Sequence, residues 1–97
     1  MPFMRTLRFT NQAESDLTDI YEYGVRQFGV RAAESYMQML GDKFAQMTEL
    51  PELFPVFKGI ESDYRKAVVQ KHVICFRSGP DEVVVVRVIG RQTTEQL

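Results

Sequence analysis

The stretch EVVVVRVI at residues 82–89 decides the fold of this 97-residue chain. Six of its eight residues are β-branched and apolar, which is typical of a buried β-strand. Two similar runs precede it at residues 64–69 and 72–77, and the links between the runs span residues 70–71 and 78–81. Links this short fit tight turns, and the second contains the Gly and Pro that favour one. The sequence therefore predicts a three-stranded antiparallel meander.

The residues before this meander predict one further strand and two helices. Residues 3–9 alternate along the chain in the way that a short strand does. Apolar residues then recur every three or four positions over roughly residues 11–27 and 31–49, as on one face of a helix. Thr10 or Asn11 can cap the first helix, and Pro51 ends the second. Four aromatic residues on these stripes are interpreted as helix-packing core: Tyr21, Phe28, Tyr36 and Phe44.

The resulting fold class is α+β. A short link at Gly29 joins the helices into a hairpin, which packs on one face of a mostly antiparallel sheet. The length and a composition of 44% hydrophobic and 26% charged residues predict a single globular domain over residues 1–97. One cysteine and one histidine exclude an internal disulfide and leave little for a metal site, and no cofactor is expected. With no apolar run of about 18 residues and no signal-peptide pattern, we expect a cytoplasmic protein.

Charge is distributed unevenly along the chain. Residues 10–49 hold seven acidic and three basic side chains, a net charge of −4, whereas residues 58–97 hold seven basic and five acidic ones, a net charge of +2. The formal total of −1 argues against direct binding of nucleic acid. A sheet that meets an anionic partner is one interpretation of the basic half, and ordinary solvated charge on strand edges is the other.

Both faces of the predicted meander are apolar. Pairing Val69 with His72 and Val73 with Val86 places one set of side chains toward the helices: Ala67, Val69, Ile74, Phe76, Val83, Val85 and Ile89, with His72 and Arg87 at one end. The opposite face carries Val68, Val73, Cys75, Val84, Val86 and Val88, with Arg77 at its fringe. Because one helical hairpin covers one face only, we expect a partner polypeptide on the second. The alternative is that residues 50–60 or self-association cover it.

Four stretches in this order resemble the ParE toxins of the RelE/ParE superfamily. They are TNQAESDL at residues 10–17, IYEY at 20–23, KHVICFR at 71–77 and VVRVIGR at 85–91. The resemblance implies the toxin of a type II toxin–antitoxin module that inhibits DNA gyrase. It also implies a ParD-like antitoxin whose flexible C-terminal segment wraps the toxin. The predicted antitoxin-binding residues are those of the second face: Val68, Val73, Cys75, Arg77, Val84, Val86 and Val88.

The resemblance leaves a choice between two branches of the superfamily. RelE-type relatives cut mRNA on the ribosome, with an arginine on the penultimate strand, a second after the last strand and a tyrosine or histidine near the C-terminus. Here the first position corresponds to Val73, residues 92–97 contain no tyrosine or histidine, and only Arg91 fits. The comparison favours a protein inhibitor over an enzyme. A ribosome-dependent endoribonuclease and a non-toxic antitoxin-binding remnant are the alternatives.

Three residues are candidates for contact with the target: His72, Arg87 and Arg91. Arginine suits bidentate recognition of carboxylates, and histidine can act as an acid or base near neutral pH. Each has a structural alternative, since Arg87 can tie down its own chain and His72 can be a strand-end histidine bonded to backbone or water. Cys75 is interpreted as a small buried hydrophobic residue rather than a nucleophile.

Overall fold

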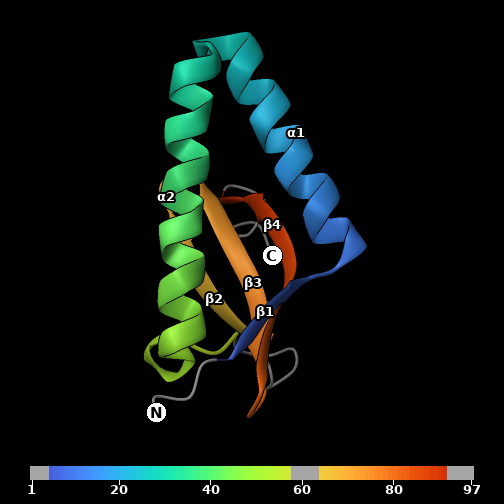
Figure 1. The fold of residues 1–97 in the computed structure, drawn as a ribbon, viewed down its shortest axis with the longest axis vertical. Coiled ribbons are helices and arrows are strands. Elements are labelled where there is room, and N and C mark those ends of the chain that lie inside the picture. The colour runs from blue at the N-terminus through green and yellow to red at the C-terminus, as the bar shows by residue number, and fades with distance from the viewer. Residues whose placement is uncertain (1–4, 58–63, 92–97) are drawn as a thin grey trace.

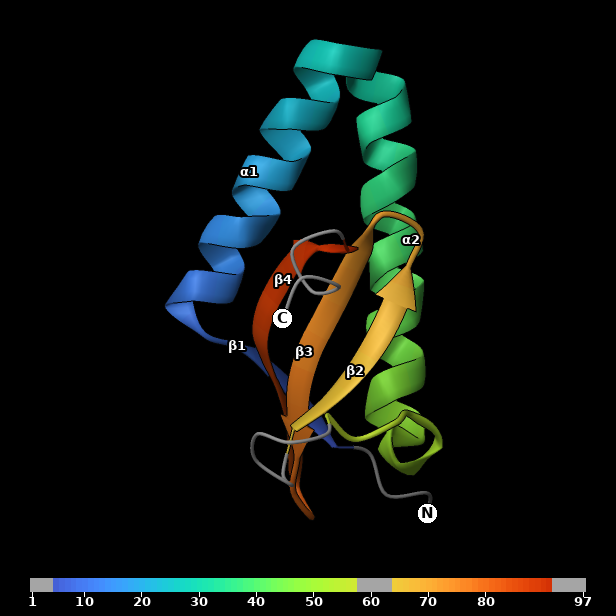
Figure 2. The ribbon, with the colours of Figure 1, turned by 180° about the vertical axis from the view of Figure 1, so that it is seen from behind.

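A computed structural model of the chain describes residues 5–57 and 64–91. Its elements are β1 (Thr6–Phe9), α1 (Asn11–Phe28), α2 (Val30–Glu49), a 3₁₀ turn at Pro51–Leu53, β2 (Tyr64–Val69), β3 (His72–Ser78) and β4 (Glu82–Gly90). Figures 1 and 2 show the two helices on one side of a single sheet. The predicted α+β fold is confirmed, and the predicted helix and later strand bounds agree to within one residue. The first two residues of the predicted first strand lie outside the described part.

The sheet is mixed, with strand order β1-β4-β3-β2. β2, β3 and β4 form the predicted antiparallel meander. β1 adds to the outer edge of β4 and runs parallel to it, from Thr6 opposite Glu82 to Phe9 opposite Val85. The first strand therefore leads the chain along β4, and the helical hairpin starts where β1 ends.

Local sequence explains the helical hairpin. Thr10 caps α1, because its Oγ1 accepts a hydrogen bond of 3.0 Å from the Ala13 N–H. Gly29 joins the helices with a φ of 93°, a conformation that glycine adopts at little cost. A side chain at Gly24 would place its Cβ 3.3 Å from the Cβ of Ala33, so the helices pack closely near this link. The two helices can therefore remain in contact beyond the sheet.

The core lies between the hairpin and the inner face of the sheet. Leu40, Phe44 and Met47 of α2 and Ala13 of α1 belong to one buried cluster with residues from the strands: Ala67, Val69, Ile74, Phe76, Val83, Val85 and Val88. Burial of each large side chain in such a cluster contributes about 1.5–3 kcal/mol. The cluster fixes the lower half of the hairpin on the sheet.

The strand register agrees with the prediction in one hairpin and differs in the other. Val69 pairs with His72 and Ala67 with Ile74 as predicted, across a turn where Gln70 has a φ of 48°. In the second hairpin the turn lies one residue further along, with the Gly79 N–H bonded to the Glu82 carbonyl oxygen at 2.8 Å. Phe76 then pairs with Val85 and Cys75 with Arg87, so that Val86 is the extra residue of a β-bulge. The predicted pairing of Val73 with Val86 is wrong, and Val73 pairs with Ile89.

The bulge exchanges the faces of three side chains. Arg87, predicted with His72 on the helix-covered face, pairs instead with Cys75 of the second face. Val88 pairs with Ile74 and is only 3% exposed in the core beneath the helices, so its predicted place on the second face is wrong. Ile89, predicted on the helix-covered face, lies opposite Val73 instead. An inserted residue shifts the two-residue alternation of every side chain after it.

The second face is less open than the sequence predicts. Val68 is 44% exposed, but Val73 and Val84 are 2% and 8% exposed. At the edge of β2, Val56 bridges to Arg65 and Lys66 lies over the Phe57 ring. The expectation that the valines of this face are exposed is therefore wrong for Val73 and Val84. Val68 is exposed, as expected.

The hydropathy of the two helices bears on whether either could cross a membrane. Among residues 5–57 and 64–91, neither helix combines the length and the apolar character needed to cross a bilayer.

Gly41 offers a direct test of helix propensity in α2. It is exposed, and a Cβ built there meets nothing within 4 Å. Nothing in the structure explains a glycine at this position. Gly41→Ala should raise the free energy of unfolding by about 0.5–1 kcal/mol, because alanine loses less backbone entropy in a helix. Urea unfolding followed by far-UV circular dichroism measures the change, and a lower stability for the variant would contradict it.

Candidate functional site

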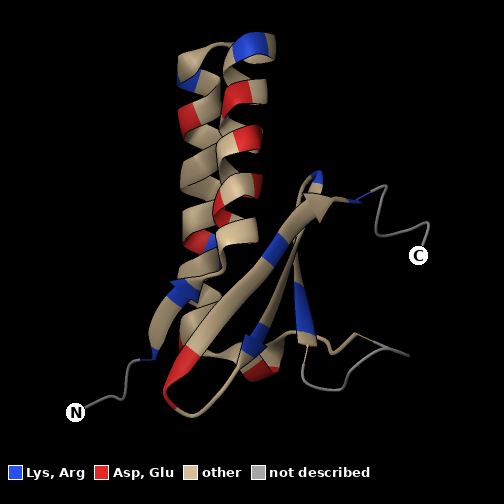
Figure 3. Ribbon diagram, turned by 90° about the vertical axis from the view of Figure 1, so that its right-hand side faces the viewer, with Lys and Arg blue, Asp and Glu red and all other residues tan. Residues whose placement is uncertain are grey.

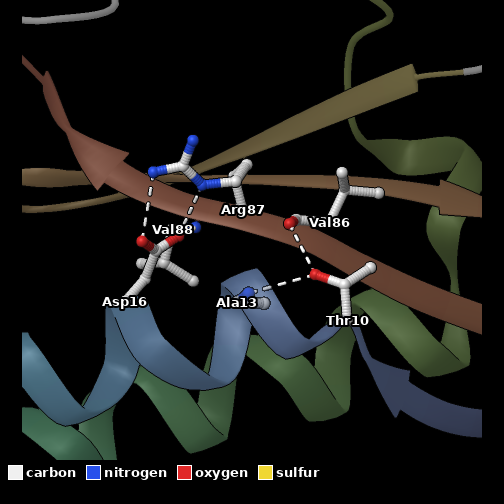
Figure 4. A network of polar contacts seen from close by, with 6 residues as sticks. All are labelled: Thr10, Ala13, Asp16, Val86, Arg87 and Val88. Atoms are coloured by element: carbon white, nitrogen blue, oxygen red, sulfur yellow. Dashed lines mark hydrogen bonds and ion pairs between the residues drawn. The ribbon is translucent and has the colours of Figure 1, made fainter.

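A buried carboxylate joins α1 to the edge of β4, just beyond the end of β1 (Figure 4). The Asp16 carboxylate accepts hydrogen bonds from Arg87 Nε at 2.8 Å and Nη2 at 3.1 Å. It also accepts one of 2.9 Å from the Val88 backbone N–H. The Thr10 hydroxyl bonds to the Val86 carbonyl oxygen at 2.8 Å on the same edge. The first turns of α1 thus satisfy the backbone groups that β1 leaves unpaired.

The electrostatics of this pair favour the charged forms. Burial acts to raise the pKa of Asp16, but the hydrogen bonds from Arg87 and Val88 and the Arg87 charge outweigh it and leave the pKa below 3.8. The hydrogen bond to Asp16 raises the pKa of Arg87. The Arg87 charge is therefore neutralised within the chain. This arrangement favours the structural alternative for Arg87 over the predicted contact with a target.

His72 lies at the start of β3, where it pairs with Gly90 rather than with Arg87. Its Nδ1 is 2.6 Å from the Tyr36 hydroxyl, and that hydroxyl donates to the Val69 carbonyl oxygen at 3.0 Å. The Tyr36 hydroxyl therefore lies between the Val69 carbonyl oxygen and the His72 ring. Burial and the charge of Lys71 lower the pKa of His72, so the ring is neutral at pH 7. Tyr36 of α2 in this way holds the turn between β2 and β3.

The third predicted target contact, Arg91, is at the same end of the sheet as His72. Its backbone N–H bonds to the Lys71 carbonyl oxygen at 2.8 Å, and its side chain reaches the Gln70 carbonyl oxygen at 3.4 Å. Arg87 and His72 both line a small hollow of about 290 Å³ with Asp16 and Asp19. The structure therefore brings the three candidates to one end of the sheet, and each makes a contact within the chain.

A larger cleft of about 540 Å³ adjoins this hollow, and the sequence does not predict it. It lies between the upper part of the hairpin and the turn at residues 70–72. Its lining residues are Asp19, Ile20, Tyr23, Gly24, Phe28, Ala32, Ala33, Tyr36, Gln70, Lys71 and His72. Phe28 is 66% exposed here, so its predicted role in the core is wrong. Helical spacing shows which residues share a stripe but not where the sheet beneath that stripe ends.

Cys75 is half-buried on β3 beside Arg87. Burial raises the pKa of its thiol, which keeps the sulfur protonated and a weak nucleophile. Within the described ranges, no three His, Cys, Asp or Glu side chains are grouped as metal ligands.

Comparison with known proteins identifies the family of this chain. A family model described as the ParE toxin of the type II toxin–antitoxin system, parDE, matches residues 7–94. The chain belongs to the ParE toxin family. Toxin ParE1 of Caulobacter vibrioides is 28% identical over 86 residues, which cover 89% of this ParE-family chain and 88% of the relative.

Solved structures share the fold of this ParE-family toxin. A chain of the chromosomal ParDE system from P. aeruginosa has a TM-score of 0.76 at 19% identity, covering 90% of this chain and 96% of that one. A chain of the RelBE2 toxin–antitoxin complex from Mycobacterium tuberculosis has a TM-score of 0.65 at 18% identity, covering 94% and 95%. At these identities the likeness establishes the fold alone.

Removal of the Asp16 carboxylate should destabilise the fold. Asp16→Ala leaves the Val88 N–H and the Arg87 guanidinium without their acceptor, and we expect a loss of about 2–3 kcal/mol in the free energy of unfolding at pH 7. Asp16→Asn should lose less, because its amide oxygen can still accept from Val88. The matched control Asp19→Ala, at an exposed position on the same helix, should change stability by less than about 0.5 kcal/mol. Equal losses for Asp16→Ala and the control would contradict the assignment.

The same pair predicts a pH dependence. The contribution of a carboxyl with a lowered pKa is complete above its unfolded value of 3.8 and is lost as the pH falls from there through the folded-state value. The wild-type chain should therefore lose more stability below pH 3.8 than Asp16→Asn does, as measured by urea unfolding.

Proposed function

We propose that this chain is a gyrase-inhibiting toxin that a ParD-like antitoxin neutralises. The observation that carries the proposal is the family match over residues 7–94 on a chain with the same fold. Family membership establishes that the chain is the toxin of a type II toxin–antitoxin system. The target enzyme and the kind of antitoxin are what we propose.

The chemistry of the site supports an inhibitor rather than an RNA-cleaving enzyme. Cleavage of RNA at the 2′-hydroxyl needs a positioned acid or base and cations around the scissile phosphate. Here Arg87 is neutralised by Asp16, and His72 uses Nδ1 on Tyr36. Val73, at the position that aligns with the arginine of RelE-type relatives, is buried. These contacts favour binding over catalysis.

The purified chain should inhibit supercoiling by DNA gyrase, and its cognate antitoxin should relieve the inhibition. The measurement is agarose-gel conversion of relaxed plasmid over a range of toxin concentrations, with a heat-denatured toxin as the control. A translation extract provides the opposing assay. Unimpaired supercoiling together with ribosome-dependent cleavage of mRNA would contradict the proposal and favour the endoribonuclease.

Not all of the residues predicted to bind the antitoxin lie at the surface of the second face. Val68 and Arg77 are exposed, Cys75 and Val86 are half-buried, and Val73 and Val84 are buried beneath this face. Val88 lies in the helix-facing core and leaves the set. Figure 3 shows mainly basic residues along the strands and mainly acidic residues along the helices. An extended segment with apolar and acidic side chains fits the remaining surface, which is the segment we propose for the antitoxin.

Val68→Asp should weaken antitoxin binding at least about tenfold, because it places a charge in the exposed apolar part of this surface. Val30→Asp is the matched control, since Val30 is also an exposed valine but lies at the start of α2. Isothermal titration calorimetry measures both affinities, and thermal unfolding checks that both variants remain folded. Binding by folded Val68→Asp at wild-type strength would refute the surface assignment.

A further inference from the structure

The second face of the sheet, which is turned away from the helices, carries charged as well as apolar side chains (Figure 2). In the part of the chain that the structure describes, two ion pairs match four of these charges within the protein. Arg8 Nη1 lies 3.1 Å from the Glu82 carboxylate, and Arg87 Nε lies 2.8 Å from the carboxylate of Asp16. These four side chains therefore add no net charge to the face.

Two further cations of this face have no carboxylate partner among residues 5–57 and 64–91. They are Lys66 of β2 and Arg77 of β3. Lys66 pairs with Cys75, and Arg77 lies two residues beyond Cys75 on the same face, so the two cations are diagonal neighbours. Long side chains at diagonal positions are within reach of one another. An anion supplied by a partner between them would therefore contact both.

Apolar surface adjoins the two cations. Tyr64 pairs with Arg77, and Val68 lies two residues from Lys66 on the same face. Val68 is 44% exposed. The Lys66 ammonium lies 5.6 Å from the centre of the Phe57 ring, and this attraction limits where the side chain can move. The accessible part of the face thus has a positive position next to an apolar one.

We propose that Lys66 and Arg77 together bind one carboxylate side chain of the antitoxin, next to an apolar contact at Val68. The proposal rests on the proposed function and adds the chemistry by which the antitoxin is recognised. Side chains on one face of an extended chain are two residues apart. An extended antitoxin segment that lies along β2 would therefore present an acidic and an apolar side chain two positions apart.

The charges favour an acidic polypeptide over nucleic acid. The phosphate backbone of a nucleic acid carries a charge at every nucleotide, whereas this face offers two cations and the chain has a net charge of −1. Arginine can bind one carboxylate through two parallel hydrogen bonds. Because Lys66 and Arg77 have the same sign, a basic residue in this position would be repelled.

Charge reversal tests the pair. Lys66→Glu and Arg77→Glu should each weaken binding of the cognate antitoxin about tenfold or more, because repulsion replaces attraction. Lys43→Glu and Arg26→Glu are matched controls on the helices, since Lys43 also lies over a phenylalanine ring and Arg26 is exposed as Arg77 is. Both controls should bind with wild-type affinity. Surface plasmon resonance measures the affinities, thermal unfolding checks that all four variants are folded, and all four should inhibit supercoiling like the wild type.

A compensating change in the antitoxin tests direct contact. Acidic residues of the antitoxin that lie two positions from an apolar residue are replaced singly by lysine. One of these antitoxin variants should bind Lys66→Glu or Arg77→Glu about tenfold more tightly than the unchanged antitoxin does, as expected for residues in contact. Rescue by none of them would overturn the assignment.

The outcomes distinguish the inference from the proposed function. A wild-type chain that does not bind the antitoxin would refute both. If the wild type binds and folded Lys66→Glu and Arg77→Glu bind equally well, the proposed function stands and the inference is overturned. Loss of gyrase inhibition with antitoxin binding retained would assign the pair to the target. Binding of duplex DNA by the wild type that both variants lose would assign it to nucleic acid, and either result would overturn the inference.

Discussion

The attachment of α1 to the free edge of β4 is the interaction on which this structure depends. β1 pairs with β4 only as far as Val85, and the backbone beyond that point would otherwise be open on one side. Thr10 and Asp16 satisfy it with the carbonyl oxygen of Val86 and the N–H of Val88, and Asp16 also receives Arg87. A helix that begins in this way is fixed in position along the strand, and the rest of the hairpin follows from it.

This attachment has consequences for binding. It pairs the Arg87 guanidinium with a carboxylate of the same chain, and it directs the hairpin past the end of the sheet. The result is a molecule with two unlike surfaces. The strands present basic side chains around Val68, and the hairpin presents an aromatic cleft whose charged lining residues are Asp19 and Lys71.

The β-bulge shows where pattern analysis fails. Alternation along residues 82–89 predicts the strand correctly, but it cannot show that Val86 is an extra residue opposite Cys75 and Phe76. One inserted residue moves Val88 into the core and places Ile89 on the other face. The bulge coincides with the bond from Thr10 to Val86 and precedes the bonds of Asp16, and these contacts join residues more than seventy positions apart in sequence.

The sequence by itself determined the element order, the helical hairpin, the β2–β3 register and the family resemblance. These depend on local periodicity, caps and turns, which neighbouring residues specify. Only the tertiary structure decided the β3–β4 register, the pairing of Arg87 with Asp16, the bond between His72 and Tyr36, and the exposure of Phe28. Each of these depends on which distant segments meet and on where the sheet ends beneath the helices, and no local pattern carries that information.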